Sequence, residues 1–296
     1  MPNQDEMAGV AHTIVNQNEA DMSEFWTSER MANAIPLPVP RMPLGGGLES
    51  GPSLEEGERI IVPPNSVSVA EKGDTAATIA QPVPNPGSWP YACVGKMFMS
   101  FGGTGYVASG WCASGSAYVF GTAGHCVYDT STDQWATNVM FCPSYTPNGP
   151  GDKYYATKLV TLVGWATNHN FAYDIGFVVV SKSMFENRGN LGLVFTKGTG
   201  PFTAVGYPAN APFPGNQMYK ATGNAVPSTT GIAMNNNDMG GGSSGGPWMI
   251  NYQGQFGYVN GVQSYHNDNP HVIEHSPSYG GQGAYNAWRC AVANQC

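Results

Sequence analysis

A glycine-rich run at residues 240–248 holds two adjacent serines, Ser243 and Ser244. Glycines on both sides of a serine let the backbone turn tightly, so that the hydroxyl stands clear and neighbouring amides point at one spot. A serine nucleophile needs both features, because its oxygen must be accessible and the oxyanion that it creates needs hydrogen-bond donors. Taken alone, the run is equally typical of a flexible loop.

Two upstream segments supply the other groups that a nucleophilic serine requires. His125 lies in the sequence Thr-Ala-Gly-His-Cys at residues 122–126, and Asp174 stands before an apolar run at residues 175–180. A buried acid at the mouth of such a run needs a partner, which His125 would supply. The order histidine, aspartate, serine is one of the known chain orders of a catalytic triad. We therefore expect His125 as general base, Asp174 as its orienting acid and Ser244 as nucleophile.

Together, the three segments resemble those of chymotrypsin-like serine proteases. The Thr-Ala-Gly-His-Cys, Asp-Ile and Gly-x-Ser-Gly-Gly-Pro sequences occur in the expected order, and the resemblance covers roughly the last two-thirds of the chain. It implies an endopeptidase that forms an acyl-enzyme on Ser244, with the amides of Gly242 and Ser244 as the oxyanion hole. It also implies polypeptide substrates and no metal or cofactor.

Specificity is the part of this interpretation that stays open. Asp238 lies six residues before Ser244, where trypsin-like members place the acid that binds a P1 Arg or Lys, so we expect a slight preference for basic P1 residues. The neighbouring Asn235, Asn236 and Asn237 make a solvated loop an equally good explanation.

A second resemblance favours an acidic P1 residue. Ser243 stands where many animal members carry the aspartate that pairs with the new N-terminus, so the chain is more similar to the bacterial glutamyl endopeptidase and related microbial branches. That branch usually binds the substrate acid with a histidine, and the corresponding position here is Gln263. Ser264, Tyr265 and His266 would form the backbone edge that pairs with substrate as an added strand.

The last two-thirds of the chain reads as short β-strands bounded by glycine, proline, asparagine and serine. The expected strands lie at residues 93–101, 106–111, 117–120, 139–141, 155–165, 175–180, 202–207, 218–221, 231–234, 248–250 and 256–265. This pattern predicts an all-β fold, a barrel or a sandwich. The resemblance implies two packed antiparallel six-stranded β-barrels, with the site between them, and residues 284–293 read as a short closing helix.

Residues 1–85 differ in composition from residues 86–296. They hold 4 Lys/Arg and 12 Asp/Glu, a net charge of −8, whereas the remainder holds 8 of each. With its proline-rich run at residues 36–43, this leader should stay extended or loosely ordered, apart from a short helix around residues 21–34. The resemblance implies a propeptide followed by a catalytic domain at 86–296; a tail without a regulatory role is the alternative. Candidate boundaries are residues 59–60, 72–73 and 82–90.

The cysteines and the charge also bear on location and partners. Six cysteines with 11% charged residues favour a secreted protein, although residues 1–6 are not a signal peptide. The neutral main part offers no basic patch for nucleic acid, and no apolar run is long enough to span a membrane. We expect a monomer.

The resemblance implies a Cys112–Cys126 bridge beside His125. The four remaining cysteines allow three connectivities, of which we favour Cys93–Cys142 and Cys290–Cys296. A zinc site is disfavoured, because no closely spaced Cys/His set occurs.

Three other functions were weighed. One is a protease-fold binding protein without turnover, although all three triad residues are present. Another is an esterase that uses the same triad. The third is the Gly-x-Ser-x-Gly nucleophile elbow of an α/β-hydrolase, with Asp268 and His271 or His275 downstream. The elbow requires a helix after the serine, which Pro247 argues against, and it would leave the histidine segment unexplained.

Overall fold

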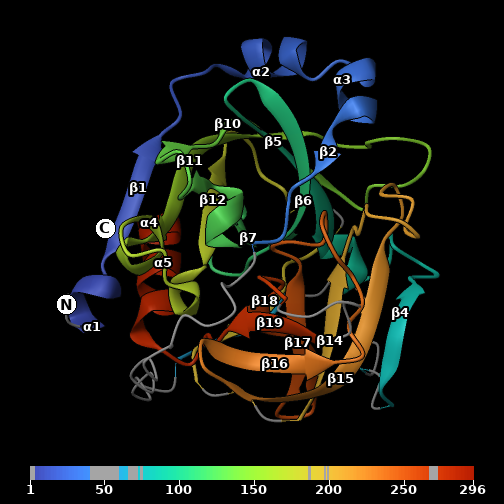
Figure 1. Cartoon of the computed structure of the whole chain (residues 1–296), viewed down its shortest axis with the longest axis vertical. Helices are drawn as coiled ribbons and strands as arrows, with labels where there is room; N and C mark the ends of the chain where they lie inside the picture. The colour runs from blue at the N-terminus through green and yellow to red at the C-terminus, as the bar shows by residue number, and fades with distance from the viewer. Residues whose placement is uncertain are drawn as a thin grey trace.

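The computed structural model describes residues 4–40, 60–65, 73, 76–185, 188–196, 198, 200–266 and 273–296. Two β-sheets form the two halves of the molecule, and the N-terminal residues run around the upper half (Figure 1). The all-β prediction is confirmed. Asp268 and His271 lie outside the described residues, and so do residues 59 and 72 at two of the candidate boundaries.

The first sheet closes on itself as an antiparallel barrel of six strands, in the order β11-β10-β5-β6-β7-β12, because β12 pairs again with β11. Its strands are β5 (Val94–Phe101), β6 (Thr104–Cys112), β7 (Val119–Thr122), β10 (Thr137–Pro143), β11 (Tyr154–Leu162) and β12 (Gly176–Val180). Short elements between them are 3₁₀-helices η1 (Tyr91–Cys93), η2 (Gly124–Cys126) and η3 (Phe171–Tyr173), strands β8 (Tyr128–Asp129) and β9 (Gln134–Trp135), and helix α4 (Val163–Ala166).

The second sheet has nine strands, of which six follow the order β19-β16-β15-β14-β17-β18. Its strands are β3 (Ile61–Val62), β4 (Thr78–Pro82), β13 (Gly192–Val194), β14 (Pro201–Gly206), β15 (Tyr219–Ser228), β16 (Gly231–Asn235), β17 (Pro247–Tyr252), β18 (Gln255–Val262) and β19 (Ile273–Pro277). An isolated bridge between Tyr265 and His275 brings the chain after β18 back to β19. A complete second barrel stays a prediction.

The leader contributes elements to both sheets. Strand β1 (Val10–Ile14) pairs with β11, and β2 (Ile35–Pro36) pairs with β6. In the second sheet, β3 pairs with β13 and β4 with β15. Helices of the leader are α1 (Gln4–Met7), α2 (Glu19–Phe25) and α3 (Ser28–Asn33).

The described part of the leader is therefore more ordered than its composition predicted. The single helix expected at residues 21–34 is divided in two. The side chains of Asn18 and Thr27 cap α2 and α3 respectively, and each accepts a backbone N–H that would otherwise lack a partner.

Strand β5 shows why the leader can pack so closely. All of its residues except Phe101 are buried, which is typical of a strand that is covered on both faces. Met97 belongs to the main core, whereas Phe98 belongs to a separate apolar cluster that includes Trp26 of the leader. The outer face of the barrel is apolar at this point, and the leader covers it.

The cysteine predictions were correct for one pair out of three. Cys290 and Cys296 form a disulfide at the C-terminal helix α5 (Gln282–Ala293), which was predicted at residues 284–293, whereas the other four cysteines are free thiols. Among the described residues, no helix is long and apolar enough to cross a membrane.

The strand register explains both errors. In the antiparallel β6–β7 ladder Cys112 lies opposite Phe120, and the chain then runs away from Cys112 on its way to Cys126. In the β5–β10 ladder, Cys142 lies opposite Lys96, three residues beyond Cys93. That offset is about 10 Å, more than the roughly 7 Å that a disulfide allows between Cα atoms. Burial raises the pKa of Cys112 and Cys142 to about 12, so both stay protonated thiols.

Candidate active site

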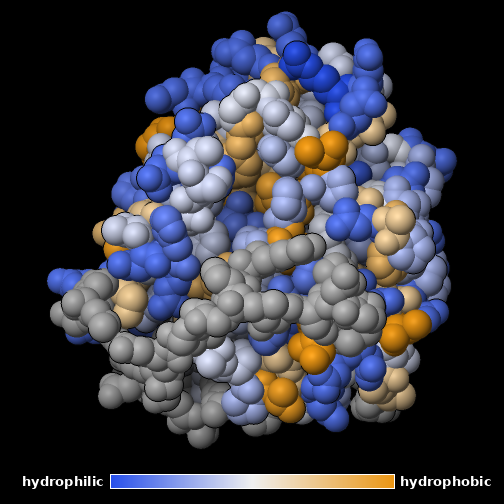
Figure 2. Space-filling view, in the orientation of Figure 1, coloured by the Kyte–Doolittle hydropathy of each residue, from blue (hydrophilic) through white to orange (hydrophobic). Residues whose placement is uncertain are grey.

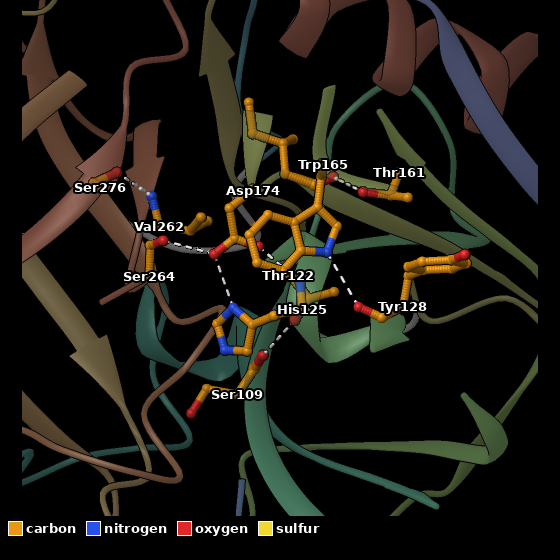
Figure 3. A network of polar contacts seen from close by, with 11 residues as sticks. Ser109, Thr122, His125, Tyr128, Thr161, Trp165, Asp174, Val262, Ser264 and Ser276 are labelled. Atoms are coloured by element: carbon orange, nitrogen blue, oxygen red, sulfur yellow. Dashed lines mark hydrogen bonds and ion pairs between the residues drawn. The ribbon is translucent and has the colours of Figure 1, made fainter. Parts of the chain in front are cut away.

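His125 lies in the single turn η2, directly after β7, and is 5% exposed. Asp174 contacts it twice. The backbone amide of His125 donates to Oδ1 of Asp174 at 2.7 Å, and its ring Nδ1 lies 2.8 Å from Oδ2 (Figure 3). With the carboxylate as acceptor, Nδ1 carries the proton and Nε2 is left as the basic nitrogen.

Asp174 is fully buried and receives a third hydrogen bond from the other half of the molecule. The hydroxyl of Ser264, which follows β18, donates to Oδ2 at 2.6 Å. Burial opposes protonation of His125, but the adjacent Asp174 carboxylate outweighs it, so that the pKa of His125 is well above its ordinary value. The Asp174 carboxylate therefore stabilises the protonated, positively charged form of the His125 imidazole.

Close packing holds this pair in place. A Cβ atom on Gly124 would lie 3.0 Å from Oδ1 of Asp174 and 2.8 Å from the hydroxyl of Thr161, so only glycine fits before His125. Trp165 contacts the imidazole edge-to-face, with 6.2 Å between ring centroids, and its own N–H donates to the carbonyl of Tyr128. The four-residue helix α4, which carries Trp165, thus backs the site.

Ser244 lies in a turn between β16 and β17, in which Gly242 and Gly245 have φ angles of +93° and +79°. Glycine adopts this region without strain, unlike most residues. The carbonyl of Ser244 accepts a hydrogen bond from the amide of Ser109 in β6 at 2.8 Å. A Cβ on Gly245 would overlap the hydroxyl of Thr122. The serine turn is thus in direct contact with the strand end that leads to His125.

The reactive atoms are enclosed. The hydroxyl oxygen of Ser244 and Nε2 of His125 are both buried, and neither has a hydrogen-bond partner within the described residues. The amides of Ser243, Gly245 and Gly246 bond to backbone carbonyls, whereas within the same part of the chain no acceptor is recorded for the amides of Gly242 and Ser244. These two amides are the ones that the sequence predicted as the oxyanion hole.

Gln263, expected near the substrate side chain, is buried in a network of amides. Its Oε1 accepts from the indole of Trp248 at 2.6 Å and from Nδ2 of Asn237 at 2.8 Å. Its Nε2 lies 3.4 Å from the hydroxyl of Ser243. A solvated loop was one of the two explanations for the segment around Asn237, but Asn237 is only 1% exposed.

Ser264, Tyr265 and His266 follow as an extended segment that pairs with β19. The amide of Ser264 donates to the carbonyl of His275, and the amide of His275 donates to the carbonyl of Tyr265. Nδ1 of His266 lies 3.8 Å from Oε2 of the buried Glu274. Sequence reasoning missed Glu274, because its contact with His266 depends on the pairing of two strand ends.

Asp238 is not part of this network in the structure. Its Oδ1 accepts a hydrogen bond from the backbone amide of Ala80 in β4 at 2.8 Å. The acid next to Asn237 is thus directed at a strand of the leader, whereas Asn237 itself is directed at Gln263.

An antiparallel barrel carries a buried histidine–aspartate pair at the end of one strand, and a serine turn from a second sheet packs against that strand end. This arrangement defines the class of chymotrypsin-like serine hydrolases. The α/β-hydrolase alternative is wrong, since the serine turn is followed by β17 and not by a helix.

Solved structures agree with this class. The protease Anisep from Arthrobacter nicotinovorans is 30% identical, with a TM-score of 0.65 over 73% of this chain and 100% of that one. The thermostable serine protease AL20 from an extremophilic microorganism is 28% identical, with a TM-score of 0.63 over 68% of this chain and 97% of that one. A Glu endopeptidase shares the fold at 19% identity, with a TM-score of 0.59 over 73% of this chain and 97% of that one. The chain belongs to the chymotrypsin-like serine proteases.

No protein-family model and no curated protein sequence matches the chain.

Proposed function

We propose that the protein is a serine endopeptidase that cleaves polypeptides through His125, Asp174 and Ser244. The observation that carries this proposal is the buried His125–Asp174 pair at the end of β7, against which the serine turn packs. His125 takes the proton of the Ser244 hydroxyl as that oxygen attacks the scissile carbonyl, and it then gives the proton to the leaving amine. The amides of Gly242 and Ser244 bind the oxyanion.

The roles of the supporting residues follow from their contacts. Asp174 keeps the proton on Nδ1 and stabilises the imidazolium, and Ser264 holds the carboxylate in that orientation. Ser264, Tyr265 and His266 present the substrate-binding edge, with the Gln263 amide network behind it. A preference for Arg or Lys at P1 requires that Asp238 first be released from Ala80.

We further propose that the protein is secreted as a monomeric proenzyme, with residues 1–85 as prosegment and residues 86–296 as catalytic domain. The disulfide at α5 and the secretory character of the composition support secretion. The burial of the reactive atoms in the intact chain supports a precursor that needs activation.

The test of the catalytic proposal is covalent labelling with a fluorophosphonate, before and after limited proteolysis of the purified protein. After proteolysis and dilution, the label should react with the chain that retains Ser244, whereas the Ser244→Ala variant should stay unlabelled. Ser243→Ala is the matched control and should retain labelling, because Ser243 donates its hydroxyl to the carbonyl of Gly240. Equal labelling of the native chain and Ser244→Ala would contradict the proposal.

Casein cleavage by a matched preparation that has not been labelled separates an endopeptidase from a binding protein without turnover. The ratio of ester to amide hydrolysis separates it from an esterase. Cleavage of denatured casein that is lost in Ser244→Ala is the expected result.

A further inference from the structure

Residues 4–40, here called the N-terminal arm, are attached to the first barrel along their length. Strand β1 pairs antiparallel with β11 over five residues, from Val10 opposite Leu162 to Ile14 opposite Lys158. Figure 1 shows the arm in blue, running from β1 over the top of the barrel through α2 and α3 to β2. The first attachment is thus a backbone ladder, whose strength does not depend on particular side chains.

The second attachment is a side-chain anchor in the middle of the arm. Trp26 is 1% exposed, packs against Phe98 of β5 and donates its indole N–H to the carbonyl of Asn138. Gln17 makes a reciprocal pair with the same asparagine, since its Nε2 donates to Oδ1 of Asn138 and its Oε1 accepts from the Asn138 amide, both at 2.8 Å. A buried aromatic with satisfied polar groups around it is typical of an interface hot spot.

The third attachment brings the arm to the catalytic serine. Strand β2 runs parallel to β6, and the amide of Leu37 donates to the carbonyl of Val107 at 2.9 Å. A Cβ on Gly241 would lie 3.0 Å from the carbonyl oxygen of Leu37 and 3.2 Å from the side chain of Pro36. Gly241 directly precedes Gly242, the expected oxyanion donor. The end of the arm therefore lies against the turn that must receive the substrate.

The surface of the arm differs from its contact side. Its outward residues over α2 and α3 are hydrophilic (Figure 2), whereas Met22, Trp26, Met31 and Leu37 are buried against the barrel. A segment with one polar and one apolar side is suited to bind as a separate polypeptide. Its apolar side packs on the apolar outer face of β5 and β6 and covers it.

We propose that the N-terminal arm is a built-in inhibitor that stays bound by these contacts alone, so that cutting the chain after the arm does not open the site. Activity then requires dissociation of the arm. After cleavage, the arm stays on the outer face of β5 and β6 as a non-covalently bound polypeptide. The inhibitory role rests on the proposed peptidase function, because it is measured as peptidase activity. The binding of the arm is measured by gel filtration and does not depend on that function.

The binding test uses the full-length chain with Ser244→Ala and a recognition sequence for a site-specific protease inserted between Pro40 and Ile60. After complete cleavage, the two pieces should co-elute in gel filtration at micromolar concentration and separate only on dilution. Elution of the arm as a free peptide at micromolar concentration would overturn the proposal. This readout involves no catalysis, so it stands even if the peptidase proposal fails.

Two arm variants and a control sharpen the binding test. Trp26→Ala should raise the dissociation constant at least 100-fold, and Gln17→Ala about tenfold; the latter removes only the pair with Asn138 and serves if Trp26→Ala does not fold. Glu29→Ala, an exposed residue of α3, should change nothing. Equal dissociation of all three variants would show that these contacts do not hold the arm.

The inhibition test uses the same insertion in the chain that retains Ser244. Cleavage alone should leave peptidase activity within about twofold of the uncut protein at high concentration, and dilution should raise specific activity at least tenfold as the arm leaves. Full activity immediately after cleavage, with the arm still co-eluting, would overturn the inhibitory role.

Discussion

The sequence suggested a role for each of two acids, Asp174 and Asp238, and the structure surrounds them very differently. Asp174 is completely buried and accepts three hydrogen bonds, two from His125 and one from Ser264. Asp238 is partly buried and accepts one, from the backbone of the leader strand β4. The first acid is oriented by both halves of the molecule, whereas the direction of the second depends on a segment that is proposed to leave.

The two acids would need different surroundings for the roles proposed for them. A triad acid must be held in one orientation throughout the reaction, and multiple donors provide this. An acid that binds a substrate side chain must instead be free to change partners. The bond from Ala80 to Asp238 therefore makes the proposed specificity role of Asp238 conditional on the state of the leader, whereas the bonds of Asp174 all come from residues outside the leader.

The strongest test of the comparison is Asp174→Asn. Loss of the carboxylate should lower kcat by roughly 10⁴-fold, because the imidazole loses its correct tautomer and the charge that stabilises its protonated form. Steady-state kinetics of the activated protein measures this loss. A comparable loss in Asp238→Asn would remove the distinction between the two acids.

The pH profile should report the same pair. Activity depends on unprotonated Nε2, so kcat/KM should rise with pH and reach its half-maximum above the ordinary histidine value of about 6.5, since Asp174 raises the pKa of His125. Removal of the carboxylate should move this midpoint to lower pH. An unchanged midpoint in Asp174→Asn would assign the titration to another group.

The same shift has a consequence for stability. A histidine whose pKa is raised by folding stabilises the native state below its unfolded pKa, and this contribution is lost as the pH rises through the folded value.

Ser264→Ala is a weaker test of the catalytic half. Asp174 would retain both bonds from His125, so kcat should fall only about tenfold, with a loss of about 1 kcal/mol in the free energy of unfolding. Kinetics and urea denaturation give the two values. A loss as large as that of Asp174→Asn would mean that Ser264 itself takes part in the reaction.

The smallest effect should come from Asp238→Ser in a chain that has lost the N-terminal arm but retains β4. It removes one hydrogen bond to β4 and should cost about 1–2 kcal/mol of stability, while selectivity among P1 residues changes less than about threefold. A library of P1-varied peptides measures selectivity. A marked loss of cleavage after Arg and Lys would show that Asp238 acts in the pocket with β4 still in place.

From the sequence, the residues of the candidate site were easier to identify than the contacts around them, because the two depend on different information. His125, Asp174 and the serine turn lie in short segments whose local chemistry is distinctive. Ser264 was predicted as part of a backbone edge, but its bond to Asp174 arises only when the two halves of the molecule meet. The register that separates Cys112 from Cys126 likewise depends on strand pairing, which composition does not reveal.

The leader illustrates the same limit. Its acidic, proline-rich composition predicted little order, yet Trp26 and Leu37 are buried. A few apolar residues spaced along a polar segment are enough to attach it when a matching surface exists, and no pattern within the segment itself identifies that surface. The helix at α5 was easier to predict, because its apolar side repeats within a single turn-by-turn pattern.

Strand β1 also determines the order of events when the chain first folds. Its five residues pair with β11, about 150 positions further along the chain, so the N-terminal residues emerge long before their partner strand exists. Contacts between such distant segments form late, because the intervening chain must be ordered first. Each newly made molecule should therefore pass through a state in which the barrel is complete and the arm has not yet docked. The rate of docking sets how long a nascent molecule could cleave its neighbours.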